Sequence, residues 1–492
     1  MRVLRNAALA CLLVSLSTLT LTSTYANNGK TYGKGHPFTI DQLPPGQFKQ
    51  DLKALPEAAQ KNAVAWMNEN TFTDLDFVYL RVDKQGGVFF EDPAFEGSEA
   101  ELYESTPVLE ELSLVETFAL HSKPGASRTV FIDMDGREVT GTIWNANAGA
   151  DPLIMRPYDS DGDESSFTQT ELNQIAETWR RIAEDFAPFD VDVTTEDPGQ
   201  FGPNVGVLLI TEKTDVNGNV IYNCGCGGVA YVNVWGRSNF EYYQPALVFT
   251  EGVGTGAHNM SEAGSHEVGH NLGLSHDGND VRGYYTGHGE GNVSWAPIMG
   301  VGYYEEVTQW SKGEYLNANQ TQDDMAIITD KLSAGADDHG DTRAQATPLN
   351  ITSGSVVATS PVIDPFNSSP DNKGIIETRD DLDVFSFDSG SGTVDLTITP
   401  GWFEVFASSN NRGMNIDIQA TLFDATGTVI TSSNPLDDTF AQITANVPAG
   451  TYYLEIDGVG LGDPLGTGYT DYGSLGNYFI NGSVPELSLI HI

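Results

Sequence analysis

The chain has 492 residues, too many for a single ordinary domain, so we expect two or three domains. It carries 24 basic and 68 acidic side chains, which gives a formal net charge of −44. Because nucleic acids and anionic membranes are bound through Lys and Arg, this balance argues against both as partners. It suits an extracellular medium in which salt or divalent cations screen the charge, or it simply keeps an exported protein in solution.

The first 26 residues have the pattern of a secretory signal peptide. Arg2 and Arg5 precede an apolar stretch from Ala7 to Leu21, and small residues lead up to Ala26. No apolar stretch approaches the roughly 20 residues that a membrane span needs. We therefore predict cleavage after Ala26 and a soluble, secreted, extracellular protein that acts as a monomer. Without the two arginines, 22 basic residues face 68 acidic ones, a net charge of −46.

Residues 27–123 form a polar, acidic segment that we interpret as a pro-region or a small N-terminal domain. It contains one helical pattern, over Phe48–Met67, and one strand-like pattern, over Phe77–Val82. It contains no cysteine. We expect the processed chain to begin between Leu120 and Arg128, where Gly, Pro and Ser indicate an exposed joint.

Residues 124–334 alternate strand and helix patterns. The segment Arg128–Gly136 alternates apolar residues, and a capping box from Thr168 to Glu171 opens a helix with one apolar face. Four strand candidates follow, and then a second helix from about Met260 to Gly273. This order predicts an α/β domain with a mixed, mainly parallel sheet. The four strand candidates lie within residues 189–195, 205–211, 227–235 and 246–250.

Two cysteines remain after removal of the signal peptide, Cys224 and Cys226. In an exported protein we expect them to pair, although one intervening residue is unfavourable for disulfide geometry. A C-x-C sequence followed by glycines also resembles part of a metal site, but two thiolates alone are too few ligands. Both interpretations stay open at this point.

Residues 337–485 lack helical patterns and predict an all-β sandwich. Short alternating segments are separated by turns such as PAG and ATG, a spacing typical of antiparallel sheets. The segments are residues 383–387, 394–398, 416–422, 443–447, 452–456 and 478–480.

Three of the nine histidines lie close together in SHEVGHNLGLSHDG, residues 265–278. On a helix His266 and His270 share a face, and Gly273 can adopt a positive φ that ends the helix and lets His276 reach the same point. Catalytic zinc takes three protein ligands and leaves one position open. We therefore predict Zn²⁺ held by His266, His270 and His276.

Glu267 follows the first of these histidines. It is rotated by about a third of a turn from His266, so its carboxylate lies beside the metal and not on it. A carboxylate in this place can take a proton from a zinc-bound water. We predict that Glu267 is the catalytic general base.

Asp159, Asp161 and Asp163 alternate just before the capped helix. Oxygen ligands at this spacing favour Ca²⁺. The loop departs from an EF-hand, since its glycine, Gly162, is at the fourth position and Glu171 comes one place late. The alternative is that acidic residues before a helix gain about 0.3–1 kcal/mol from its dipole without any ion.

The pattern H-E-x-x-H-x-x-G-x-x-H from His266 to His276 resembles the metzincin zinc peptidases. Asp277 after the third histidine is similar to the reprolysin (adamalysin) branch, and Met299 in APIMG matches the methionine-containing turn of that fold. The resemblance covers roughly residues 128–330. It implies that Met299 supports the site without ligating, and that the strand within residues 227–235 pairs with an extended substrate.

Two positions depart from the family pattern. Reprolysins usually carry cysteine where Pro297 stands, so a gametolysin-like relative stays open as an alternative. Some metzincins have a tyrosine where Val301 stands. Tyr303 and Tyr304 follow it, and they serve either packing or the transition state.

The segments DDLDVFSFD, ATLFDATGTVI and PAGTYYLEIDG, within residues 337–484, are similar to the pre-peptidase C-terminal domain of bacterial secreted proteases. Together the two resemblances imply a secreted zymogen of a zinc-dependent endopeptidase that hydrolyses extracellular proteins. The alternative is an adhesin or matrix-binding protein with a vestigial zinc domain, but a vestigial site would not need Glu267.

Overall fold

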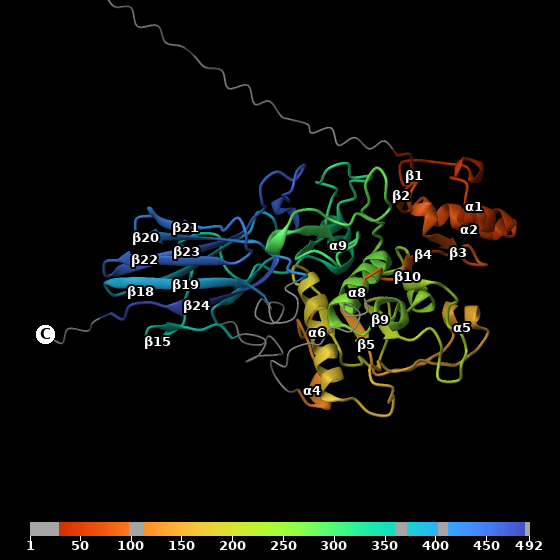
Figure 1. The fold of residues 1–492 in the computed structure, drawn as a ribbon, viewed down its shortest axis with the longest axis horizontal. Helices are drawn as coiled ribbons and strands as arrows, with labels where there is room; N and C mark the ends of the chain where they lie inside the picture. Colours follow the sequence, from red (N-terminus) through yellow and green to blue (C-terminus); the bar gives the residue numbers. More distant parts are fainter. Residues whose placement is uncertain (1–28, 98–111, 360–370, 402–411, 488–492) are drawn as a thin grey trace, which may run out of the picture.

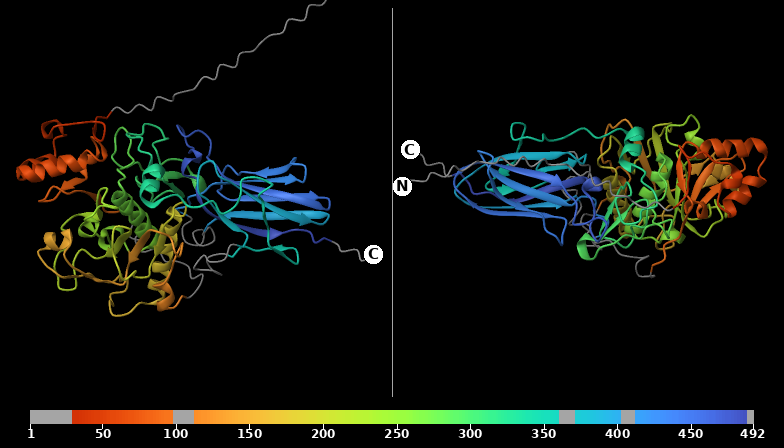
Figure 2. Two further views of the ribbon diagram at one scale, coloured as in Figure 1. Left: turned by 180° about the vertical axis from the view of Figure 1, so that it is seen from behind. Right: turned by 90° about the horizontal axis from the view of Figure 1, so that it is seen from above.

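A computed structural model describes residues 29–97, 112–359, 371–401 and 412–487. The N-terminal segment lies at one end of an elongated molecule, an α/β region lies in the middle, and β-strands form the other end (Figures 1 and 2). The predicted signal peptide, residues 1–26, falls outside the described residues. Within those ranges, no helix is long and apolar enough to cross a membrane.

The N-terminal segment differs in two places from its sequence prediction. The expected helix over residues 48–67 is two helices, α1 (Gln47–Ala54) and α2 (Glu57–Met67), because Pro56 between them has no N–H to continue a helix. The expected strand over residues 77–82 begins with a 3₁₀ turn, and only its second half is extended. The segment contains β1 (Thr31–Gly33), β2 (Thr71–Thr73), η2 (Asp76–Val78), β3 (Leu80–Val82) and β4 (Val88–Pro93), and α4 (Leu114–Thr117) follows it.

The middle region contains the seven-stranded sheet of the molecule, in the order β3-β4-β10-β11-β9-β5-β8. The pairs β5·β8, β5·β9 and β9·β11 are parallel, whereas β10·β11, β4·β10 and β3·β4 are antiparallel. Strands of the N-terminal segment therefore extend the sheet beyond β10 and make it mixed. The other strands are β5 (Thr129–Asp133), β8 (Asp192–Thr194), β9 (Val205–Thr211), β10 (Cys226–Tyr231) and β11 (Ala246–Phe249).

Helices α6 (Gln169–Asp185) and α8 (Ala257–Leu272) pack against each other and against this sheet. The capping box predicted for α6 is present, since Thr168 accepts from the Glu171 N–H and Glu171 accepts from the Thr168 N–H. On the other face, Trp144 and Trp66 contact the Tyr231 ring. The remaining elements are β6 (Glu138–Val139), α5 (Ile143–Ala148), β7 (Leu153–Ile154), η3 (Phe240–Tyr243), α7 (Thr250–Val253), η4 (Gly291–Val293), β12 (Trp295–Pro297), β13 (Val307–Gln309) and α9 (Asp324–Leu332).

The C-terminal β region consists of two sheets whose inward side chains share one core. One sheet has the order β14-β18-β23-β20-β21, and the other has the order β15-β16-β24-β19-β22 with β17 also paired to β24. All six segments predicted from alternation lie within or overlap strands. The strands are β14 (Thr347–Pro348), β15 (Ile351–Thr352), β16 (Ser355–Val356), β17 (Lys373–Ile376), β18 (Leu382–Ser389), β19 (Gly392–Pro400), β20 (Ile418–Asp424), β21 (Val429–Ser433), β22 (Ala441–Val447), β23 (Gly450–Gly458) and β24 (Gly476–Ser483).

Candidate metal centre

Helix α8 and the turn after it bring the three predicted ligands together. His266 and His270 lie one turn apart on α8, and both are buried. The helix ends at Gly273, whose φ of 117° confirms the expected positive value, and the Gly273 N–H donates to the carbonyl of Gly269 (3.1 Å). The chain then turns back so that His276 faces the same point.

The three imidazoles converge through their Nε2 atoms. The Nε2 atoms of His270 and His276 are 3.1 Å apart, and the Nε2 atom of His266 is buried without a hydrogen-bond partner among the described residues. On the other side of two rings, Nδ1 of His266 donates to the Ile298 carbonyl and Nδ1 of His270 donates to the Leu274 carbonyl, both at 2.8 Å. These bonds fix the ring orientations and leave Nε2 free for a metal.

The donor set fits zinc. Tetrahedral ligands at about 2.0–2.1 Å from a zinc ion lie about 3.3 Å from one another, close to the 3.1 Å between the Nε2 atoms of His270 and His276. Burial, and after it the neighbouring His270, lowers the pKa of His266 to about 3, so that its imidazole is in the neutral form that ligates. The three histidines therefore lie close enough together to hold one metal ion.

Glu267 lies beside this cluster, against strand β10. A Cβ atom on Gly228 would come within 1.8 Å of the Glu267 Oε1 atom, so the absence of a side chain there makes room for the carboxylate. Burial, followed by the nearby Asp92 carboxylate, raises the pKa of Glu267 well above its usual value. A cation in the histidine cluster would lower it again.

Met299 lies beneath the histidines, as the resemblance implied. It is fully buried, and a Cβ atom on Gly269 would come within 2.6 Å of the Met299 sulfur. Its carbonyl accepts from the Asp277 N–H (2.8 Å), which ties the methionine turn to the residue after the third histidine. Tyr303 and Tyr304 pack on Phe95, with ring centroids at 5.2 and 5.6 Å.

Asp92 of β4 is a fourth member of the cluster that the sequence did not reveal. Its Oδ2 atom lies 3.2 Å from His270 Nε2 and 3.6 Å from His266 Nε2, and its Oδ1 atom lies 3.1 Å from His276 Nε2. Burial opposes ionisation, but the His270 and His276 imidazoles outweigh it and hold the pKa of the Asp92 carboxyl well below its usual value. A buried group of one carboxylate and three histidines results.

Aromatic side chains surround this group. Phe90 stacks on His270 with a centroid distance of 4.3 Å, and Tyr284 lies against His276 at 4.1 Å. The Tyr284 hydroxyl also donates to Asp92. The Asp76 Oδ1 atom lies 3.4 Å from His276 Nδ1. No spacing in the sequence connects these residues to the histidine motif.

A cavity of about 430 Å³ opens beside the histidines. It is lined from both sides, by the N-terminal segment and by the middle region. Its walls include Tyr79, Asp92, His266, Glu267, Tyr284 and Val301.

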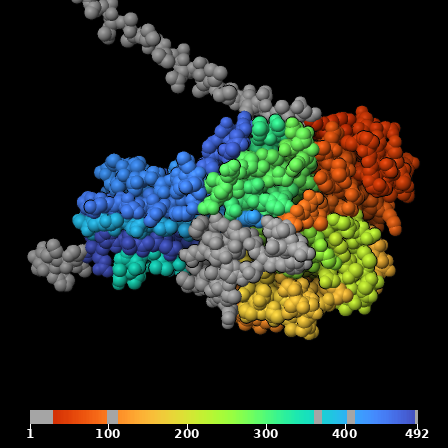
Figure 3. Space-filling model, in the orientation of Figure 1, coloured from red at the N-terminus to blue at the C-terminus, as the bar shows by residue number. Residues whose placement is uncertain are grey.

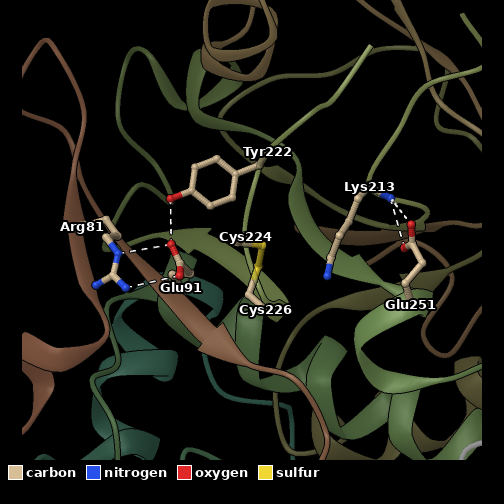
Figure 4. The surroundings of a disulfide bond; sticks show 7 residues. All are labelled: Arg81, Glu91, Lys213, Tyr222, Cys224, Cys226 and Glu251. Atoms are coloured by element: carbon tan, nitrogen blue, oxygen red, sulfur yellow. Dashed lines mark hydrogen bonds and ion pairs between the residues drawn. A yellow bond between two sulfur atoms is a disulfide. The ribbon is translucent and has the colours of Figure 1, made fainter. Parts of the chain in front are cut away.

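The expected disulfide is present between Cys224 and Cys226, at the start of β10. The alternative of a metal site at these cysteines is therefore wrong. Figure 4 shows the disulfide close to Tyr222 and Glu91, which are hydrogen-bonded to each other.

The structure does not support the calcium site that was one of the two alternatives for the loop before α6. Oxygen atoms of Asp159, Asp161 and Glu171 lie within 4.8 Å of one another, but Asp163 is not part of this group. Its carboxylate accepts instead from the backbone and hydroxyl of Ser165. Glu171 is already an acceptor for the N–H groups of Ser160 and Thr168, as a helix cap requires.

Comparison with known proteins supports the interpretation of this site. Residues 164–277 match the family described as metallo-peptidase family M12B, reprolysin-like. No match to a curated protein sequence was found. Among solved structures, the pre-peptidase C-terminal domain of collagenase from Bacillus anthracis matches at 13% identity, over 28% of this chain and 92% of that domain. Its TM-score is 0.17, which carries no argument about the fold. The stretch that contains all three histidines and Glu267 is thus similar to the reprolysin-like metallopeptidases, and the match implies a metallopeptidase.

Proposed function

We propose that this protein is a secreted zinc-dependent endopeptidase that hydrolyses peptide bonds of extracellular proteins. The observation that carries the proposal is the convergence of three buried histidine Nε2 atoms next to a buried glutamate. His266, His270 and His276 would hold the zinc ion. When bound, zinc supplies a Lewis acid that lowers the pKa of a water molecule and polarises the scissile carbonyl.

Glu267 performs the proton transfers in this proposal. Its position next to the ligand histidines lets it accept a proton from the attacking water and later donate it to the leaving amine. Its Oε2 atom is buried without a hydrogen-bond partner among the described residues, so it is available for this transfer. Met299 and the carbonyls of Ile298 and Leu274 keep the histidines in place.

Strand β10 provides the binding surface for an extended peptide. Within the middle region β10 is the last strand of the sheet, and the edge that β4 of the N-terminal segment occupies could form main-chain hydrogen bonds with a substrate strand once β4 has left it. The C-terminal β region, residues 337–485, is in this proposal a pre-peptidase C-terminal-like sandwich. All residues assigned to catalysis precede it, so we assign it no role in bond cleavage.

The test compares the wild-type protein with Glu267→Gln, both freed of the N-terminal segment. We expect the variant to keep one zinc per chain and to lose about 10²- to 10⁴-fold of its activity on a short peptide, because the ligands survive and the proton acceptor does not. Glu251→Gln, an exposed carboxylate before α8, is the matched control and should stay fully active. A wild-type protein that binds zinc but cleaves neither casein nor short peptides would favour the alternative of a binding protein with a vestigial site.

A further inference from the structure

Strand β4 of the N-terminal segment lies on the edge that the proposed function assigns to substrate. It pairs antiparallel with β10, and the register places Asp92 opposite Gly228 and Phe90 opposite Ala230. Two hydrogen bonds continue the contact at either end, from Val232 N–H to the Val88 carbonyl (3.1 Å) and from Phe95 N–H to the Gly252 carbonyl (2.9 Å). A substrate strand and β4 therefore cannot occupy β10 together.

The alternation of β4 directs two side chains into the metal centre. Side chains of successive residues in a strand point to opposite faces. Phe90 and Asp92 face the histidines, where Phe90 covers His270 and His276 with ring centroids at 4.3 and 4.1 Å. Phe89 and Glu91 face the other way, toward Tyr231 and Tyr222.

Contacts on that opposite face hold β4 in register. Tyr222 of the middle region donates to Glu91 Oε2 (2.9 Å), and Arg81 of β3 forms an ion pair with the same carboxylate (3.2 Å). Figure 4 shows Glu91 between these two partners. A shift of one residue would turn Asp92 away from the histidines, so this anchor determines which side chain reaches them.

The Asp92 carboxylate lies where a fourth zinc ligand would be. Its oxygens are 3.1–3.6 Å from the three Nε2 atoms, the spacing expected between ligands of one tetrahedral ion. The position left open for water in a catalytic zinc site would be taken by this carboxylate.

We infer that the N-terminal segment is an internal inhibitor, in which Asp92 is the fourth zinc ligand and β4 fills the substrate strand position. This inference rests on the proposed function, because latency has a meaning only if the uncovered site is active. The segment contains no cysteine, and an aspartate on a paired strand takes the place that a thiolate could have had.

Activation then requires β4 to leave β10. Leu120 and Ser122, near the expected processing joint, are held against β8, since Leu120 N–H donates to Thr195 Oγ1 (3.0 Å) and Ser122 N–H donates to the Val193 carbonyl (3.0 Å). Pro124, Gly125 and Ser127 are exposed. The accessible part of the joint is therefore residues 124–127, and the processing site remains a prediction.

The first experiment measures the coordination of the bound metal and not the enzymatic activity. The intact chain with Glu267→Gln, which prevents self-cleavage, is loaded with Co²⁺, whose visible absorption reports its ligands, and is titrated with azide. We compare Asp92, Asp92→Asn and Asp92→Ala in this background. We expect the Asp92→Ala chain to show a changed spectrum and to bind azide at least about 10-fold more tightly, because the fourth position becomes free. Asp92→Asn keeps the shape of the side chain and guards against misfolding, and its spectrum should also change.

The matched control is Asp41→Asn, which removes a carboxylate from the same segment at a side chain that is 84% exposed. It should leave both the spectrum and the azide affinity unchanged. Identical spectra and azide affinities for Asp92, Asp92→Asn and Asp92→Ala would overturn the inference.

The second experiment uses the chain with Glu267 intact and a short peptide substrate. We expect the intact protein to be at least about 100-fold less active than the protein cut at residues 124–127, and Asp92→Ala to recover part of this difference before cutting. If the cut protein is inactive after it has been separated from the N-terminal segment, the proposed function fails. If the cut and intact proteins are equally active, the proposed function stands and the inhibitor role of the N-terminal segment is wrong.

Discussion

The N-terminal segment and the C-terminal β region pack on the same middle region, but they meet it in different ways. In Figure 3 the N-terminal segment (red) lies directly against the middle region (green), and the C-terminal region (blue) lies at the opposite end. The N-terminal segment reaches the metal centre itself, through Phe90 and Asp92. Among the described residues, the C-terminal region contacts helix α6 at Asp185 and the chain between α8 and α9 at Tyr303, and none of its residues is among those that line the cavity beside the histidines.

The C-terminal contact is a buried polar network. Asn415 Nδ2 donates to Asp185 Oδ1 (2.8 Å) and to the Thr308 carbonyl (3.0 Å). Asp185 in turn accepts from Ser265, the residue before His266. Glu184 accepts from the Asn477 side chain (2.7 Å). The difference teaches that one terminal region covers the proposed catalytic groups, whereas the other contacts the helices that position them.

The largest effect on activity is expected at Gly228, next to the groups that the N-terminal segment covers. Gly228→Ala places a methyl group where Glu267 Oε1 now lies, so the carboxylate must move. A displacement of about 1 Å at a catalytic group costs about 10²-fold in rate, and we expect a loss of that order in peptide hydrolysis by the processed protein. Gly225→Ala, three residues earlier with no atom within 4 Å of the added carbon, should be unaffected. Equal activity of the two variants would show that Glu267 is not held against β10.

A substitution in the contact between the C-terminal region and α6 should lower the stability of the protein. Asn415→Ala removes two hydrogen bonds and leaves the buried Asp185 carboxylate with one partner fewer, at a cost of about 1–3 kcal/mol in the free energy of unfolding. Zinc affinity and the KM for a short peptide should stay the same, because Asn415 does not touch the site. Urea denaturation, zinc titration and steady-state kinetics measure the three quantities. A control is Asn292→Ala, which removes only an exposed hydrogen bond to Asp438. A rise in the KM of Asn415→Ala without a loss of stability would contradict this account, because the C-terminal region would then act on substrate binding and not on the stability of the fold.

A smaller effect is expected in the pH dependence of stability. Burial raises the pKa of Asp185 from 3.8 to about 7. Because the folded chain keeps a proton that the unfolded chain releases, this group stabilises the fold fully below about pH 3.8, and its contribution is lost as the pH rises through about 7. Glu262, with a pKa raised to about 8 by burial, acts in the same direction.

Asp185→Asn should therefore weaken the pH dependence of the unfolding free energy without removing it, because Glu262 still contributes. Between pH 5.5 and 8 we expect the wild type to lose roughly 2 kcal/mol more unfolding free energy than the variant. Asp437→Asn, on the surface of the C-terminal region, should follow the wild type. Parallel profiles for wild type and Asp185→Asn would mean that this carboxyl is ionised throughout.

Elements with local signals could be predicted from the sequence. The capping box at Thr168, the positive φ at Gly273 and the strands of the middle region all follow from residue type and spacing. The break at Pro56 was also readable, since proline ends a helix. The pairing of β4 with β10 could not be predicted from the sequence, because it joins residues far apart in the chain and no periodicity indicates it.

The same limit applies to the site. The three proposed ligands and the glutamate lie within eleven residues, and one helix and one turn bring them together. Asp92 is one of two adjacent acidic residues in FFEDP, and Tyr284 is one of two adjacent tyrosines. Their role depends on tertiary contacts with His276 and its neighbours, which only the fold provides.

The most direct measurement is a crystal structure of the intact, zinc-loaded chain with Glu267→Gln, which keeps the N-terminal segment in place. We predict one zinc ion bound to Nε2 of His266, His270 and His276 and to an Asp92 oxygen at about 2.0–2.2 Å, with no water in the fourth position. A zinc ion that carries a water molecule, with both Asp92 oxygens beyond about 3 Å, would contradict the claim that the N-terminal segment closes the site through the metal.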